Sequence, residues 1–346
     1  MKIMILKGLM LTLCFGILAN AANAQARKKA VHRTVKKRTT AKKTTNSRTT
    51  ANISPSVRVD TVVIAPAAKI DSLPIPIVKK SLRNDDAIDR NLVTERTPLA
   101  YQYIREDDAV YRQKIWREID TREKLNLPFR YSANEDNGNQ RFISILLKAI
   151  QDGPDNGGVT VFNAVDDRFT TPMTVAEVAK TISGGSVNVP IYDSLGNVSG
   201  YKETVAEVNL DSFYKFRIKE EVIFDKQSSR LFWRILGIAP VKNVITSSGV
   251  NLGETELFWV YYPDMRPIFA KYEVYNGKNF GARMSWEELF ESRMFYGRII
   301  KSTLDNPYDQ FLNQQQGLKN NTILQLLQGE KVKNKIFDYE QNLWSY

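Results

Sequence analysis

Three pairs of adjacent acidic residues are the best candidates for chemistry in this sequence of 346 residues: Asp166-Asp167, Glu220-Glu221 and Glu287-Glu288. A hydrolase that works with two carboxylates needs them several ångströms apart on facing elements. Adjacent acids on one strand instead point to opposite faces. Glu288 also has a structural explanation, because it completes a helix capping box with Ser285. We therefore predict no catalytic residue.

Cysteine and histidine, the residues behind much nucleophilic and metal chemistry, are nearly absent. The single cysteine, Cys14, lies in an apolar segment near the N-terminus, and the single histidine, His32, lies in a basic tail. The predicted folded body has neither, which excludes thiolate or imidazole zinc sites, Ser–His and Cys–His pairs and an imidazole base. We expect no metal and no cofactor, and a core that is stable without a disulfide.

Residues 1–24 have the layout of a secretory signal peptide. Lys2 and Lys7 supply the positive end, Gly8 to Leu18 the apolar segment, and Ala22-Asn23-Ala24 a cleavage site of small residues. The apolar segment is too short to span a membrane comfortably. We expect an exported protein.

The positive charge is concentrated near the N-terminus. The chain has 49 basic and 38 acidic residues, and eleven of the basic ones lie between Arg27 and Arg58, where no acid occurs. From Val59 onward, basic and acidic residues nearly balance. Residues 25–56 have too few apolar side chains to offset the entropy of ordering, so we expect a disordered tail. In an exported protein it would either attract lipid headgroups, lipopolysaccharide and peptidoglycan or act as a solubilising spacer.

Residues 57–97 form a proline-bearing arm. Repeated proline with β-branched neighbours favours an extended path. We predict a linker over Val57–Ala67. Leu73–Val78 is either a linker or a segment that lies along a neighbouring subunit and adds a strand there. Its candidate contact residues are Ile75, Ile77 and Val78.

The folded body is predicted over residues 98–312 and opens with a helix within Tyr101–Arg130. Apolar residues there recur mostly three or four apart, which places them on one helix face. Pro128 would end the helix. The charged face opposite is either solvated or binds a partner. Its candidate contact residues are Arg117, Arg122 and Lys124.

The rest of the body alternates helices and strands without the βαβ pattern, so the fold class predicted is α+β, with mixed helices and mainly antiparallel strands. A helical extension follows over residues 313–346. Helices are expected at Asn139–Ile150, from Thr174 with a Glu177 capping box, from Ser285 through an inward-facing Met294, and near Thr322–Gln328 and Lys335–Leu343. Strands are expected at Val159–Phe162, Val187–Tyr192, Val198–Val208, Phe216–Phe224, Leu231–Ile238 and Leu257–Tyr262.

One of these strands is unusually aromatic, with Phe258, Trp259, Tyr261 and Tyr262. Such a series could form a platform on which a sugar stacks. Alternate aromatics in a strand more commonly pack into the core, and we favour that interpretation.

Short motifs spread over the body carry a family resemblance. They are Ile104–Asp108, Ile115–Asp120, Arg122–Pro128, Phe224–Gln227, Leu236–Lys242, Phe258–Pro263, Ser285–Glu288 with Phe295, and Asn306–Tyr308. In their order and spacing, from Pro98 to Asp309, they resemble the GldN/PorN family. No single motif has mechanistic meaning by itself.

The resemblance implies a non-enzymatic structural subunit of the periplasmic ring of the type IX secretion and gliding-motility machinery, beneath the outer membrane. It implies binding to the outer-membrane ring lipoprotein of the GldK/PorK type, contact with the periplasmic region of the GldM/PorM-type motor protein, and self-association in a ring. Neither a cofactor nor nucleic acid is implied. The alternatives are a periplasmic cell-wall or glycan-binding module that uses the cationic tail and aromatic strand, and a carboxylate glycan hydrolase.

Overall fold

The computed structural model describes residues 72–83, 87, 95–183, 186–193, 198–205, 208–245, 250–277 and 283–343. The chain divides into two units, Met1–Asp60 and Thr61–Tyr346, and every described residue belongs to the second. The predicted signal peptide, basic tail and Val57–Ala67 linker therefore lie outside the described residues.

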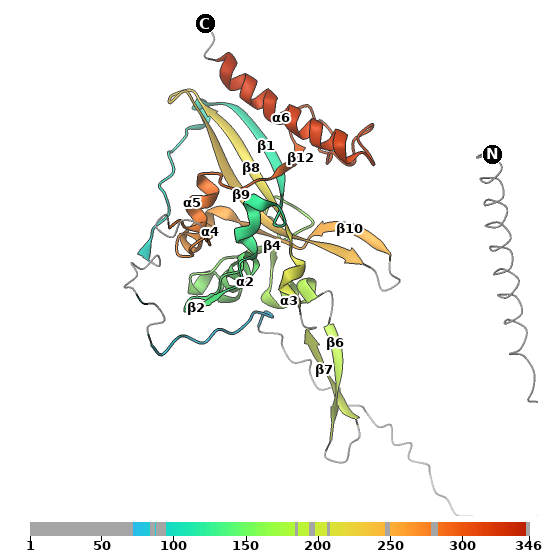
Figure 1. Ribbon diagram of the computed structural model, residues 1–346. Coiled ribbons are helices and arrows are strands. Elements are labelled where there is room, and N and C mark those ends of the chain that lie inside the picture. Colours follow the sequence, from blue (N-terminus) through green and yellow to red (C-terminus); the bar gives the residue numbers. More distant parts are fainter. Residues whose placement is uncertain are drawn as a thin grey trace, which may run out of the picture. The chain divides into compact units, whose positions relative to one another are not determined.

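An antiparallel sheet of eight strands organises this unit (Figure 1). The strands follow the order β12-β1-β8-β9-β11-β4-β5, and β10 pairs with β9 beside that path. All pairings are antiparallel, and helices accompany the sheet, so the predicted α+β class is confirmed. The strands are β1 (Ala109–Asp120), β4 (Val161–Asn163), β5 (Pro172–Met173), β8 (Lys215–Asp225), β9 (Arg230–Ile245), β10 (Asn251–Glu256), β11 (Phe258–Tyr261) and β12 (Arg298–Ser302).

The prediction of an opening helix within Tyr101–Arg130 is wrong. The central part of this segment is strand β1, which lies between β8 and β12 in the sheet. Ile115 and Ile119 point to one face of the sheet, and Trp116 to the other, and all three are buried. A strand covered on both faces loses the alternation that identifies a strand, so its apolar spacing resembles that of a helix. Pro128 lies inside the short 3-10 helix η3 (Lys124–Arg130) that follows and does not end a helix before it. A 3-10 turn, η2 (Glu106–Asp108), precedes the strand.

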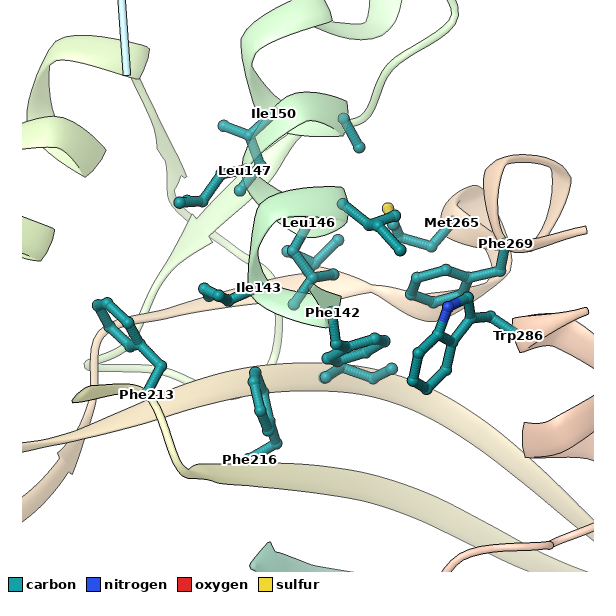
Figure 2. Packing of buried hydrophobic residues seen from close by; sticks show 14 of the residues in the cluster. Phe142, Ile143, Leu146, Leu147, Ile150, Phe213, Phe216, Met265, Phe269 and Trp286 are labelled. Carbon is teal, nitrogen blue, oxygen red and sulfur yellow. The ribbon is translucent and has the colours of Figure 1, made fainter. Parts of the chain in front are cut away.

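Four helices enclose the main core with the sheet: α2 (Phe142–Asp152), α3 (Val175–Ser183), α4 (Tyr262–Phe269) and α5 (Trp286–Glu291). Figure 2 shows Phe142 of α2 between Phe216 of the sheet and Trp286 of α5. The ring centroids lie 5.0 and 4.8 Å from that of Phe142. The helix predicted over Asn139–Ile150 is confirmed as α2.

The strand predicted over Leu257–Tyr262 is shorter in the structure, where β11 ends at Tyr261 and α4 begins at Tyr262. Pro263 lies in the first turn of α4, where its missing N–H removes no helical hydrogen bond. The capping box at Ser285 is confirmed, with both reciprocal bonds to Glu288 present. The prediction that the helix continues to an inward-facing Met294 is wrong, because α5 ends at Glu291 and Met294 is 50% exposed.

The predicted capping box of α3 (Val175–Ser183) is also confirmed. The Glu177 carboxylate accepts from the Thr174 N–H at 2.7 Å, and the Thr174 hydroxyl accepts from the Glu177 N–H at 3.3 Å. The two strands expected at Val187–Tyr192 and Val198–Val208 follow α3 and pair as an antiparallel hairpin of β6 (Ser186–Tyr192) and β7 (Val198–Val205). A second small hairpin joins β2 (Asn134–Glu135) to β3 (Gly138–Asn139), and short 3-10 turns lie at η4 (Pro154–Asn156) and η5 (Leu210–Ser212).

The C-terminal segment forms one continuous helix, α6 (Thr322–Asn342), where the sequence predicted two separate ones. Gly329 lies at the junction, and a Cβ there would be 3.0 Å from the Ile299 carbonyl oxygen, so glycine lets the helix pass close to β12. Val332 and Ile336 pack in a second cluster with β12, β1 and β8. The packing of α6 on the sheet thus stabilises one continuous helix, although it contains Gly329.

Candidate interaction surfaces

The central acid pair, Glu220-Glu221, is bound into the sheet by arginines. Glu220 is fully buried, 2.8 Å from Arg117 Nε and 2.8 Å from Arg293 Nη2. Both guanidinium groups also lie over the ring of Trp233. Glu221 points to the opposite face of β8 and pairs with Arg112 at 2.8 Å. The two adjacent acids therefore serve different structural ion pairs, as the strand geometry predicts.

The second acid pair, Glu287-Glu288, ties α5 to its surroundings. Glu287 lies 2.7 Å from Arg266 of α4 and accepts from the Leu99 N–H at 3.2 Å. Glu288 caps its own helix and pairs with Arg96 at 2.9 Å. These contacts fasten the segment before β1 to α4 and α5.

The third acid pair, Asp166-Asp167, lies in the loop between β4 and β5. Asp167 accepts from Trp116 Nε1 at 2.7 Å, and the ammonium of the buried Lys219 is 3.3 Å away. Burial lowers the pKa of Lys219, and Asp167 opposes that shift. Asp166 accepts from the Thr170 hydroxyl. Within the described part of the chain, no group of three or more His, Cys, Asp or Glu residues is placed to hold a metal ion.

Tyr101 joins the segment before β1 to the helices beneath it. Its ring is stacked between two guanidinium groups, with Arg234 3.8 Å and Arg266 3.5 Å from the ring centroid. Its hydroxyl donates to Glu291. Burial, together with that carboxylate, raises the pKa of Tyr101 well above its usual value, so the phenol stays protonated.

The candidate contact residues of the predicted opening helix do not share one face. Arg117 belongs to β1, and its charge is used by buried Glu220. Arg122 follows the strand, pairs with Asp120 and lies 4.3 Å from the ring centroid of Tyr214. Lys124 is exposed at the start of η3. Of these cations, Arg122 and Lys124 are accessible to a partner.

The described part of the arm packs in part on its own body. The Leu73 N–H donates to Gln151 Oε1 at 2.5 Å, and the Leu73 side chain is buried in the main core. Ile75 packs against the same core, whereas Ile77 is 95% exposed and Val78 is half-buried. Along residues 72–83 the structure has no strand. Leu73 and Ile75 therefore hold the arm against the main core, whereas Ile77 is accessible to a partner.

Three of the four residues in the aromatic series lie in the core, as the favoured interpretation of the sequence predicts. Phe258 and Trp259 of β11 and Tyr262 of α4 are each no more than 1% exposed, whereas Tyr261 is partly exposed. The three buried rings cannot stack on a sugar without unfolding part of the core.

One surface was missed by sequence reasoning. The first half of α6 exposes Ile323 and Leu327, which are 69% and 52% exposed, beside a cavity of about 560 Å³. The sequence contains a signal for this surface, because the helix predicted over Thr322–Gln328 has several apolar residues. Periodicity alone does not tell which side of a helix meets the sheet.

A family model described as "Gliding motility associated protein GldN" matches residues 104–345. A comparison with curated proteins finds no match. Among the helices that the structure describes, none is long and apolar enough to cross a membrane. The matched residues include the whole eight-stranded sheet and α2 to α6. The chain therefore belongs to the GldN family, associated with gliding motility and type IX secretion.

Proposed function

We propose that this protein is a non-enzymatic structural subunit of a periplasmic ring in the type IX secretion machinery. It would lie beneath the outer membrane and bind the outer-membrane lipoprotein of the ring. It would also contact the periplasmic part of the inner-membrane motor. The observation that carries this proposal is the family match, which extends over residues 104–345 and so over nearly all of the folded body.

Three further observations support this proposal. The adjacent acids that could have done chemistry are engaged in ion pairs and caps that join strands and helices. The sequence also begins with the layout of a signal peptide, which would deliver the chain to the periplasm. The buried aromatic strand removes one of the two features on which a glycan-binding module would depend.

We further propose that the accessible members of the predicted contact set, Ile77, Val78, Arg122 and Lys124, meet a partner. Arg117 and Ile75 would act indirectly, by fixing β1 and the arm. Arginine and large apolar side chains supply much of the energy of protein interfaces. An almost fully exposed isoleucine next to an anchored segment is a residue that such a contact would bury.

Co-purification from gently solubilised envelopes tests the function. The tagged chain should elute in a very large complex with a near-stoichiometric outer-membrane lipoprotein, identified by mass spectrometry. A peak at the size of a monomer that carries only glycan fragments would contradict the ring role.

Two variants sharpen this experiment. Deletion of residues 25–54 should leave the large complex intact, because a ring subunit assembles through its folded body. A wall-binding module held by charge would instead lose its retention, and its binding would weaken with salt. Ile77→Asp should reduce lipoprotein recovery, whereas Ile77→Leu, which keeps the apolar surface, should not.

A further inference from the structure

The 3-10 helix η3, which follows β1, turns a row of cations and leucines toward solvent. Because such a helix has three residues per turn, side chains three positions apart lie one above the other. The buried side of η3 carries Asn126 and Phe129. The exposed side carries the residues that we call the η3 ridge: Lys124, Leu125, Leu127 and Arg130. The two leucines are 55% and 50% exposed, and they lie between the two cations.

The η3 ridge is held in a fixed position by the residues beneath it. The Asn126 amide donates to the Tyr296 carbonyl oxygen at 2.8 Å, and the Asn126 oxygen accepts from the Tyr296 N–H at 2.9 Å. The Phe129 ring packs against Phe142 and Trp286 of the main core, with ring centroids 4.9 and 4.8 Å away. A partner of the ridge therefore does not have to order this segment when it binds.

The two cations of the η3 ridge have no counterion in the part of the chain that the structure describes. There, neither Lys124 nor Arg130 forms an ion pair. The neighbouring Arg122 differs, because it pairs with Asp120 at 2.5 Å. Glu123, the acid next to Lys124, is half-buried. A partner of the ridge should therefore carry negative charge around an apolar centre.

An anionic lipid surface has this arrangement of charge. Its phosphates lie above its acyl chains, so basic residues bind the headgroups while apolar residues between them enter the interface. The long side chains of lysine and arginine reach the headgroups while their own methylene groups stay beside apolar surface.

The charge of the rest of the chain favours lipid over an acidic protein as the partner. Eleven basic residues and no acid lie between Arg27 and Arg58, whereas basic and acidic residues nearly balance from Val59 onward. A bilayer is one continuous surface, so it can bind the basic tail and the η3 ridge at the same time. An acidic protein would need a separate site for each of them.

We propose that the η3 ridge binds the surface of an anionic phospholipid bilayer. Leu125 and Leu127 enter the level of the upper acyl chains, and Lys124 and Arg130 bind the headgroup phosphates. This contact is direct and needs no lipoprotein.

The lipid contact deepens the proposed function by naming the partner of one predicted contact residue, Lys124, and it rests on that function for the compartment of the protein. Its test needs only the purified chain and synthetic lipid. Failure of the lipid contact would therefore leave the co-purification result standing, and failure of co-purification would leave measured lipid binding standing.

A fluorescent dye on the η3 ridge tests the contact. The chain from Gln25 to Tyr346 contains no cysteine, so Leu127→Cys provides a single site for an environment-sensitive dye. Vesicles of phosphatidylcholine and phosphatidylglycerol should shift the emission of this dye to shorter wavelength, because the dye leaves water. Val165→Cys is the matched control, since Val165 is 93% exposed in the loop between β4 and β5. A dye on that loop should show no shift.

Sedimentation with the same vesicles measures whether the chain binds at all. A chain that binds the vesicles without a shift of the dye at position 127 is held by its tail alone, and this result overturns the proposal. Equal shifts at positions 127 and 165 overturn it as well. A chain that does not bind the vesicles also overturns it, and an acidic protein surface then becomes the partner that the ridge fits.

Charge reversal tests the part of the two cations. Lys124→Glu combined with Arg130→Glu should weaken vesicle binding at least ~30-fold at low salt, because two attractions to headgroups become repulsions. Lys319→Glu combined with Lys331→Glu is the matched control, since it changes the net charge equally at two other exposed lysines. It should weaken binding no more than ~3-fold, because charges away from the surface are screened. Circular dichroism should show that both variants are folded, and equal weakening by the two pairs would overturn the proposal.

Discussion

Arg117 on β1 and Glu220 on β8 are joined by a hydrogen bond of 2.8 Å between Nε and Oε2, and the Glu220 side chain is 0% exposed. The pair lies between two of the apolar clusters of the sheet. Ile119 and Ile218 belong to the main core, and Ile115 and Val222 belong to the cluster beneath α6. This ion pair therefore lies at the boundary between the main core and the cluster that α6 covers.

Loss of the Glu220 charge should destabilise the fold strongly. In Glu220→Gln two arginines near the core lose their counterion, so we expect a decrease of about 3 kcal/mol in the free energy of unfolding. Glu221→Gln is the control. Its partner Arg112 is half exposed, and the loss should stay below about 1 kcal/mol. Urea unfolding followed by circular dichroism measures both, and equal losses in the two variants would contradict the structural role of Glu220.

Asn126 should be essential for the turn after β1. The side chain is 0% exposed, and its amide donates to the carbonyl oxygens of Asp120 and Tyr296 at 2.9 and 2.8 Å. Its oxygen accepts from the Tyr296 N–H at 2.9 Å. Asn126→Ala leaves these partly buried backbone groups without their partner, and we expect a decrease of about 2–4 kcal/mol in the free energy of unfolding. Leu127→Ala should change stability by no more than about 0.5 kcal/mol, because Leu127 is 50% exposed.

Glu118 should make the protein sensitive to acid. Burial by itself would raise the pKa of Glu118, but its partners Arg298 and Lys215 outweigh burial and lower the pKa below its usual value. A carboxylate with a lowered folded-state pKa stabilises the fold fully above its unfolded pKa of about 4.3. That stabilisation is lost as the pH falls from there through the folded-state value.

Thermal melts of wild type and Glu118→Gln between neutral and acidic pH check this prediction. The wild type should melt higher at neutral pH, and the difference should shrink below about pH 4.3, where the wild-type carboxylate becomes protonated. A difference in Tm that stays constant down to acidic pH would show that the charge of Glu118 contributes nothing.

Leu73 should hold the arm on the body of its own chain. Its side chain is only 6% exposed and lies in the main core. Leu73→Ala should cost about 2 kcal/mol and increase protease cleavage between Ser72 and Arg83. Ile77→Ala is the control, because Ile77 is 95% exposed, and it should change neither quantity. Unchanged cleavage in Leu73→Ala would mean that the arm is not held by this contact.

Local sequence signals were sufficient to predict those elements that their own residues specify. The capping boxes at Thr174 and Ser285 begin helices where they were predicted. The apolar stripe from Phe142 to Ile150 forms α2. The absence of cysteine and histidine from the body is likewise a property of the sequence alone. The capping boxes and the apolar stripe depend on neighbours within about four residues, so no knowledge of distant partners is needed.

Tertiary structure decided the features that depend on distant partners. β1 is a strand because β8 and β12 pair with it on both sides, although its apolar spacing resembles that of a helix. Arg117 was predicted as a surface residue, and Glu220, 103 positions away, draws it into the sheet. The sequence alone could not show this, because burial on both faces removes strand alternation and ion pairs form between residues brought together only by folding.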